Sequence, residues 1–158
     1  MKHQFPINAL PILVSIQAAE RIEKVSLSAN PGGLACEISP TATKALTKEI
    51  LQFFEGYLYG ETLSPPPLEW RGNTPFTHSV LQKLITVPFG TTLTYAQIAH
   101  AVGSPQGARA VGGACGRNPF PFFLPCHRVV ASGGLGGFSA GLELKKLLLD
   151  FEITQNHI

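Results

Sequence analysis

Three consecutive prolines divide this chain more firmly than any other feature of its sequence. The run Ser64-Pro65-Pro66-Pro67 favours a stiff, extended segment and ends any helix before it. A chain of 158 residues can form one domain or two small ones. We therefore predict two domains, one over residues 1–70 and one over residues 71–158.

Composition excludes several classes of protein. Hydrophobic residues make up 44% of the chain and charged residues 14%, which excludes an intrinsically disordered protein. No stretch approaches the roughly 20 apolar residues of a membrane span, and residues 1–20 lack the cleavage site of a signal peptide. Three cysteines without a C-x-x-C pair do not form a disulfide framework. We expect a cytoplasmic protein that does not bind membranes.

Charge is distributed unevenly along the chain. Residues 1–70 carry five Lys or Arg and seven acids, whereas residues 71–158 carry seven Lys or Arg and three acids. The second part is therefore the better candidate for binding an anionic partner, although chance explains so small an imbalance equally well.

The first part is predicted to form three strands and a helix. Apolar and polar residues alternate over 11–18 and 23–28, and the turn Asn30-Pro31-Gly32-Gly33 leads to a third strand over 34–39. Large apolar residues repeat at helical spacing over 41–59, which predicts a helix with one buried face.

The second part is predicted to consist mainly of short helices. Thr74-Pro75 begins one helix, and the capping-box spacing Thr94-Tyr95-Ala96-Gln97 begins another that runs to about residue 101. Ser104-Pro105 is predicted to cap the next helix, over 106–115. The last two helices have the spacing of a helix-turn-helix, which either binds DNA or is a plain helical hairpin.

The second helix of this pair has an unusual composition. Arg109 is its one long side chain, and it lies among small residues that include Ala108, Gly112 and Gly113. Each helical glycine costs about 1 kcal/mol relative to alanine. Either close helix packing or close approach to a ligand would explain them. A helix surface with so few long side chains fits the narrow minor groove of DNA better than the major groove.

The run Leu124-Pro125-Cys126-His127-Arg128 concentrates the reactive side chains. A single cysteine is more often a buried, inert thiol than a nucleophile. Here the neighbouring His127 and Arg128 are expected to favour the thiolate, and a glycine-rich loop over 132–137 follows. His127 is the candidate base, acting directly or through water, because adjacent side chains on an extended chain point apart. Glu152, at the end of a helix predicted over 142–152, is either the carboxylate that orients His127 or a solvated surface acid.

Residues 75–152 resemble the O6-alkylguanine-DNA alkyltransferases, a family of direct-reversal DNA repair proteins. The first part shows only a compatible order of elements. The matching segments, in order, are Val87-Pro88-Phe89-Gly90, Thr94-Tyr95-Ala96-Gln97-Ile98-Ala99, Ala108-Arg109-Ala110-Val111-Gly112-Gly113-Ala114, Gly116-Arg117-Asn118-Pro119, Pro125-Cys126-His127-Arg128-Val129-Val130, Leu135-Gly136-Gly137-Phe138-Ser139 and Leu148-Leu149-Asp150-Phe151-Glu152.

This resemblance implies a two-domain α/β fold, with a ribonuclease-H-like first domain and a winged-helix-like second domain. It implies a monomer that binds duplex DNA without a metal or cofactor, in the cytoplasm and on the nucleoid of a prokaryote. The damaged base is flipped out, and the alkyl group of O6-alkylguanine, or of O4-alkylthymine, passes irreversibly to Cys126. His127 and Glu152 would activate the thiol, Tyr95 would donate to guanine N3, and Asn118 would act as a hinge.

The resemblance also assigns residues to the two binding surfaces. Arg109 would fill the gap left by the flipped base. The other residues expected at the DNA are Ala108, Gly112, Gly113, Thr94 and Arg117, and those expected around the guanine are Val129, Ser139, Gly136 and Phe138. Phe138 stands where many relatives have Tyr, and Ala140 where they have Gly, so the alkyl-size preference stays open. Cys115 is expected to be a packed thiol.

Two other functions remain open at this stage. A DNA-binding regulator or lesion sensor would need the helix-turn-helix but not the Pro-Cys-His-Arg run. A Cys–His hydrolase would need an oxyanion hole that no segment of the sequence identifies.

Overall fold

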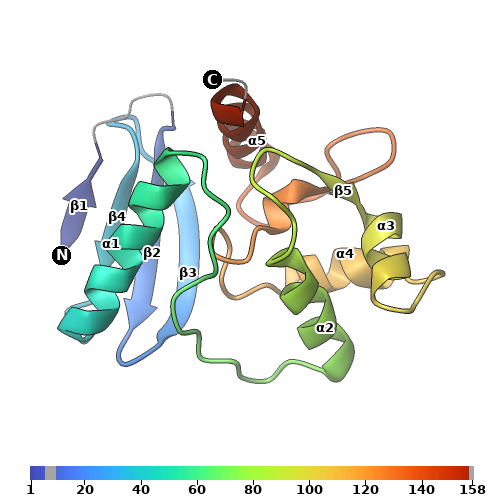
Figure 1. Cartoon of the computed structure of the whole chain (residues 1–158), viewed down its shortest axis with the longest axis horizontal. Coiled ribbons are helices and arrows are strands. Elements are labelled where there is room, and N and C mark those ends of the chain that lie inside the picture. Colours follow the sequence, from blue (N-terminus) through green and yellow to red (C-terminus); the bar gives the residue numbers. More distant parts are fainter. Residues whose placement is uncertain (6–9, 157–158) are drawn as a thin grey trace.

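A four-stranded sheet lies at one side of the molecule (Figure 1). The computed structural model describes residues 1–5 and 10–156, so positions 6–9 and 157–158 of the two predicted domains lie outside it. The central strand β2 pairs antiparallel with β3 and parallel with β4, and β1 pairs antiparallel with β4. The strands are β1 (Lys2–Gln4), β2 (Ile12–Ala18), β3 (Ile22–Ala29) and β4 (Ala35–Ile38).

The predicted three strands are confirmed, but the sheet has a fourth. Strand β1 escaped prediction because its three residues, Lys-His-Gln, have no apolar alternation. In β2 the alternation places every second side chain, from Ile12 to Ala18, in the core.

Helix α1 (Lys44–Leu58) covers one face of this sheet (Figure 1). It begins later than predicted, because the Thr43 hydroxyl accepts a hydrogen bond from Leu46 N at 3.2 Å and so caps the helix. The predicted apolar face is buried at five positions and only partly buried at Leu58. The buried positions are Leu46, Ile50, Phe53, Phe54 and Tyr57.

The proline connector is hydrogen-bonded to the sheet. Ile22 N donates to Pro67 O at 2.8 Å, and Glu69 N donates to Ile22 O at 2.8 Å. Further along the same strand, Val25 N donates to Pro119 O at 2.9 Å. The outer edge of β3 therefore binds both the connector and the loop that leads to the cysteine, which joins the two parts of the chain.

The remaining residues form a group of short helices beside the sheet (Figure 1). The helix-turn-helix is confirmed as a local structure, with the capping box at Thr94 and Gln97. The elements are α2 (Pro75–Leu84), β5 (Leu93–Thr94), α3 (Tyr95–Ala101), α4 (Ala108–Gly116), the 3-10 helix η1 (Cys126–Arg128), β6 (Val129–Val130) and α5 (Leu142–Asn156).

Ser104-Pro105 does not cap α4, so that prediction is wrong. Residues 104–106 form the turn itself, in which Gly107 N donates to Ser104 O at 2.8 Å. Gly107 then occupies the cap position without a side-chain hydrogen bond.

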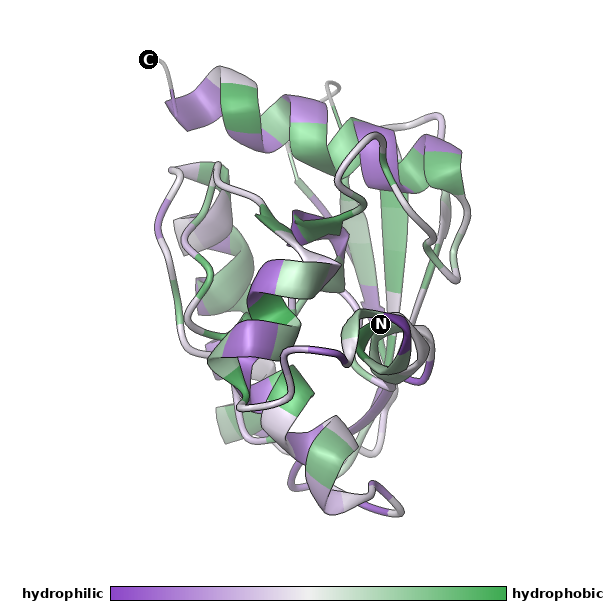
Figure 2. Cartoon of the chain, turned by 90° about the vertical axis from the view of Figure 1, so that its right-hand side faces the viewer, coloured by the Kyte–Doolittle hydropathy of each residue, from purple (hydrophilic) through white to green (hydrophobic). Residues whose placement is uncertain are grey.

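Helix α5 lies along the top of the molecule, between the sheet and the short helices (Figure 1). It continues to Asn156, past the predicted end at Glu152. Hydrophilic and hydrophobic residues alternate along its length (Figure 2). Two charged residues, Lys145 and Glu152, lie on its buried face. No helix in residues 1–5 and 10–156 is long and apolar enough to cross a membrane.

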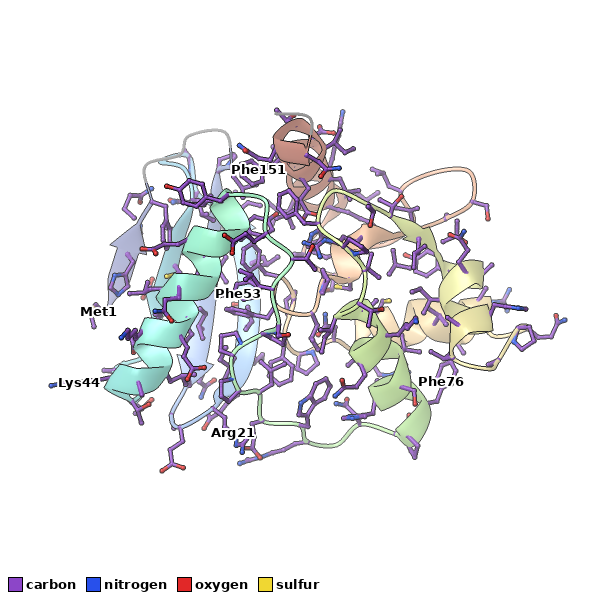
Figure 3. All side chains as sticks on the ribbon, in the orientation of Figure 1. Met1, Arg21, Lys44, Phe53, Phe76 and Phe151 are labelled. Carbon is purple, nitrogen blue, oxygen red and sulfur yellow. The ribbon has the colours of Figure 1, made fainter. Side chains whose placement is uncertain are left out.

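Aromatic rings join α1 to the loop before the cysteine. Phe122 stacks on Phe54 with ring centroids 4.9 Å apart, and lies 4.6 Å from Tyr57. Figure 3 labels Phe53 beside α1 and Phe151 near α5. Phe53 packs on Phe123, with ring centroids 4.9 Å apart, and Phe151 stacks on Tyr57, with ring centroids 5.6 Å apart. Phe122 has φ of 80°, a conformation that bulky residues rarely adopt. The surrounding rings hold this loop in place from the side of the sheet.

Candidate active site

A cavity of about 530 Å³ lies between the helix-turn-helix and the glycine-rich loop. Its volume is in the range of ordinary ligand sites. Helices α3 and α4 form one wall, and η1 and the loop over 137–139 form the other. The lining residues are Tyr95, Ala108, Arg109, Gly112, Cys115, Gly116, Cys126, Gly137, Phe138 and Ser139.

Cys126 opens η1 at the inner wall of this cavity and is 4% exposed. Burial raises the pKa of its thiol, while a hydrogen bond from Asn118 and the positive charge of Lys145 lower it. The expectation that Arg128 favours the thiolate is wrong, because Arg128 is paired with Glu152. The cation that acts on the sulfur is Lys145, which sequence analysis did not identify.

Lys145 is a buried ammonium held by two carbonyl groups. Its Nζ donates to Val129 O at 2.6 Å and to Gly137 O at 2.9 Å. Among the described residues, no carboxylate lies within ion-pair distance of it. Burial lowers the pKa of Lys145, and the thiols of Cys126 and Cys115 raise it. Helical spacing could have revealed it, since position 145 shares a face with Leu148 and Glu152.

His127 pairs with Glu152 in the interior. Its Nε2 lies 2.5 Å from Glu152 Oε2, and the histidine is fully buried. We therefore assign a proton to Nε2, so that Nδ1 is the ring nitrogen at which a lone pair can be exposed. Within the described part of the chain, Nδ1 is buried and has no hydrogen-bond partner. A buried, unpaired ring nitrogen next to a thiol residue is suited to accept a proton.

The backbone around the cysteine differs from the prediction. Cys126, His127 and Arg128 form one turn of 3-10 helix and not an extended segment. The side chains of Cys126 and His127 therefore do not have the opposite orientations of neighbours in an extended strand.

Glu152 is a buried carboxylate, so the alternative of a surface acid is wrong. It is 1% exposed and accepts hydrogen bonds from four residues. Burial raises the pKa of this carboxyl, but His127 and Arg128 outweigh that effect and lower it to about 2. It is therefore ionised at neutral pH. The donors are His127 Nε2 at 2.5 Å, Arg128 Nε at 2.7 Å and Nη2 at 3.3 Å, Tyr57 Oη at 2.9 Å and Gly90 N at 3.2 Å.

Asn118 fixes the loop between α4 and the cysteine. Its Nδ2 donates to Leu124 O at 2.9 Å, and its Oδ1 accepts from Phe120 N at 2.9 Å. Asn118 therefore links the end of α4 to the segment just before Cys126.

Tyr95 connects α3 to the glycine-rich loop. Its hydroxyl accepts a hydrogen bond from Gly137 N at 3.2 Å. Gly136 has φ of +73°, and a Cβ there would lie 2.6 Å from Tyr95 Oη. Glycine is therefore required at position 136 for the loop to approach the tyrosine.

The predicted DNA-facing residues fall into two groups. Ala108, Arg109 and Gly112 line the cavity. The other three have local contacts: Thr94 caps α3, Arg117 Nη2 donates to Thr77 Oγ1 at 3.2 Å, and Gly113 lies beside Arg117.

The glycines of α4 are not explained by packing against another helix. A Cβ at Gly112 would meet Tyr95 only at 3.9 Å, and one at Gly116 would meet nothing within 4 Å. Both positions line the cavity, which favours close approach to a ligand.

Of the four predicted guanine-facing residues, two line the cavity and two contact residues beside it. Phe138 and Ser139 line the cavity, Gly136 supports Tyr95, and the Val129 carbonyl accepts the bond from Lys145. Cys115 is packed as expected, at 9% exposure, but it borders the cavity as well. Burial raises the pKa of its thiol to about 12, so it is protonated at neutral pH.

The fold and site define a mixed α/β protein that places a buried thiol and a His–Glu pair beside a helix-turn-helix. Residues 75–154 match the family described as 6-O-methylguanine DNA methyltransferase, DNA binding domain. The chain belongs to this family of methylated-DNA--protein-cysteine methyltransferases, whose members bind DNA and transfer an alkyl group from it to one of their own cysteines.

Individual relatives agree with this assignment. A methylated-DNA--protein-cysteine methyltransferase of Methanothermobacter thermautotrophicus is 38% identical over 142 residues, which cover 89% of this chain and 73% of that protein. A "Probable methylated-DNA--protein-cysteine methyltransferase" of Acanthamoeba polyphaga mimivirus is 51% identical over 85 residues, covering 54% of this chain and 56% of the viral protein. The structure of Mycobacterium tuberculosis OGT in complex with DNA superimposes with a TM-score of 0.67 at 30% identity, covering 87% of this chain and 84% of that one.

Replacing Lys145 by Met should slow alkylation of Cys126. Without the ammonium the pKa of the thiol rises, so less thiolate is present at neutral pH, and we expect a loss on the order of tenfold. The measurement is the rate of iodoacetamide labelling at Cys126, followed by peptide mass spectrometry. Lys145→Arg should restore much of the rate. The matched control is Lys146→Met, at the exposed neighbouring position. Equal rates for Lys145→Met and Lys146→Met would contradict this electrostatic role.

Proposed function

We propose that this protein repairs O6-alkylguanine in duplex DNA by irreversible transfer of the alkyl group to Cys126. The supporting observation is the buried Cys126 thiol at the wall of a cavity. The next residue, His127, is bound through its Nε2 by Glu152. O4-alkylthymine, which carries its alkyl group on a similar ring oxygen, is the second expected substrate.

The reaction is an in-line displacement at the alkyl carbon. The Cys126 Sγ–C bond forms while the C–O6 bond breaks, and the electron pair of that bond remains on the guanine. The thiol proton passes to His127 Nδ1, directly or through one water, and the guanine anion takes up a proton to restore the normal base. The Tyr95 hydroxyl, which borders the cavity, would donate to guanine N3 and stabilise the developing charge. The product is a thioether without a good leaving group, so each protein molecule repairs one lesion.

DNA would lie against the helix-turn-helix, with the smooth face of α4 in the minor groove. Ala108 and Gly112 allow close approach, and Arg109, which is exposed at the rim of the cavity, would fill the gap left by the flipped base. Flipping costs a few kcal/mol, and less for a weakly paired lesion. Thr94, Gly113 and Arg117 would contact the DNA backbone beside this groove.

We also propose the division into domains that the proline connector suggests. Residues 1–70 would form a ribonuclease-H-like domain, and residues 71–158 a winged-helix-like domain in which β5 and β6 form the small sheet. The protein would act as a monomer on DNA, in the cytoplasm and on the nucleoid of a prokaryotic cell.

Incubation with a duplex that contains O6-methylguanine tests the proposal. We expect the intact protein to gain the mass of one methylene group, mapped to Cys126, because transfer stops after one turnover. Cys126→Ala should gain nothing and still bind the duplex. Cys115→Ala is the matched control for a second thiol at the same cavity, and it should gain the methyl group as the wild type does. A methyl group on Cys115, or transfer that survives Cys126→Ala, would contradict the proposal.

Replacing Arg109 by Ala should separate base flipping from chemistry. Repair of duplex DNA should fall by about tenfold or more, because an unfilled gap leaves the flipped state without compensation for lost stacking. Reaction with the free base O6-benzylguanine, which needs no flipping, should change less than twofold, since Arg109 is then not needed. The two rates are measured side by side by loss of the free Cys126 thiol. An equal loss of rate in both reactions would contradict the role of Arg109 in base flipping.

A further inference from the structure

The buried carboxylate of Glu152 is also bound by a residue from the other part of the chain. Tyr57, on α1, is 2% exposed and its hydroxyl donates to Glu152 Oε2 at 2.9 Å. His127 Nε2 binds the same oxygen at 2.5 Å. The tyrosine and the histidine therefore share one acceptor atom.

We propose that Tyr57 is a positioning residue for alkyl transfer, and that its hydroxyl acts through Glu152 on the histidine that receives the thiol proton. The sheet and α1 would then contribute to the chemistry as well as to the fold. This inference rests on the proposed function, in which His127 is the base.

Packing alone does not explain a tyrosine at position 57. Its ring contacts three phenylalanines, with centroids 4.6 Å from Phe122, 5.2 Å from Phe89 and 5.6 Å from Phe151. A phenylalanine would make the same ring contacts. A buried hydroxyl costs free energy unless it is hydrogen-bonded, and among the described residues its partner is Glu152.

The tyrosine is a hydrogen-bond donor at neutral pH. Burial and the neighbouring Glu152 raise its pKa well above the ordinary value. Its proton therefore stays on the hydroxyl and is available to the carboxylate. The hydrogen bond from the Tyr57 hydroxyl stabilises part of the negative charge on Glu152 Oε2. That oxygen is therefore a weaker acceptor for His127.

Few titratable or charged groups face this carboxylate. They are His127 and Arg128 from η1 and the uncharged Tyr57 hydroxyl from α1, while residues 87–90 present the Gly90 amide. Strand β3 also contacts α5, but its charged residues, Glu23 and Lys24, are exposed.

Without the Tyr57 hydroxyl, Oε2 becomes a stronger acceptor for His127. The protonated ring is then favoured, and a protonated ring cannot accept the thiol proton. Transfer should consequently lose rate at mildly acidic pH and recover at alkaline pH. The acidic limb of the pH–rate profile should move to higher pH.

Tyr57→Phe tests this inference, with Tyr59→Phe as the matched control. Tyr57 lies in the last turn of α1 and Tyr59 is the C-cap residue of the same helix, but Tyr59 is 85% exposed and its hydroxyl has no hydrogen bond within the described chain. Single-turnover transfer from an O6-methylguanine duplex is measured between about pH 5.5 and pH 9. Tyr57→Phe should be on the order of fivefold slower than wild type near pH 6 and within about twofold near pH 9. Tyr59→Phe should follow the wild type throughout.

Two results would overturn the role of Tyr57. One is a Tyr57→Phe profile that superimposes on that of Tyr59→Phe. The other is an equal slowing at all pH values, since a packing defect does not depend on the protonation of His127. A wild-type protein that transfers no methyl group would instead contradict the proposed function, so the two failures are distinguishable.

Discussion

The rest of the site depends on the hydrogen bonds that surround the buried carboxylate of Glu152. An ionised carboxylate in the interior is tolerated only when donors surround it. Those donors come from α1, from the segment over 87–90 and from η1, so one side chain on α5 fixes three separate segments. Because the pKa of Glu152 is held at about 2, it stabilises the fold above its unfolded-state pKa of about 4.3. That contribution is lost as the pH falls from there towards 2.

Helix α5 places two opposite charges on one buried face, and each acts on a different part of the site. Glu152 binds His127, the proposed proton acceptor, and Lys145 holds the glycine-rich loop to β6 while it lowers the pKa of the Cys126 thiol. Neither charge pairs with the other. The thiol therefore lies near an uncompensated cation, and the histidine is bound to an anion that three other residues also contact.

Local patterns in the sequence were sufficient to predict most of the fold and the centre of the site. Alternation located β2 and β3, and the turn at Asn30-Pro31-Gly32-Gly33 located β4. The capping residues located α2 and α3, and the run around Cys126 located the thiol and its histidine. Ser104 was misplaced because a Ser-Pro pair suits a turn as well as a helix cap. Strand β1 is defined by its pairing with β4, and its three polar residues carry no sequence pattern that predicts this pairing.

The residues that sequence reasoning missed act through contacts between distant segments. Tyr57 is 95 positions away from Glu152, and its spacing within α1 marks it only as part of the apolar face. Lys145 differs, since helical spacing alone places it with Leu148 and Glu152 on the buried side. The first part of the chain shows little resemblance to the family, yet it supplies Tyr57 and the rings that hold the loop before the cysteine.

The most direct measurement is the single-turnover rate of methyl transfer by Glu152→Gln at saturating O6-methylguanine duplex. Glutamine keeps the size of the side chain and removes its charge, so His127 loses the anion that orients it. The expected result is a rate about a hundredfold below wild type, with unchanged affinity for the duplex. A rate within about twofold of wild type would contradict the account, because the carboxylate would then be structural and the thiol would be activated without it.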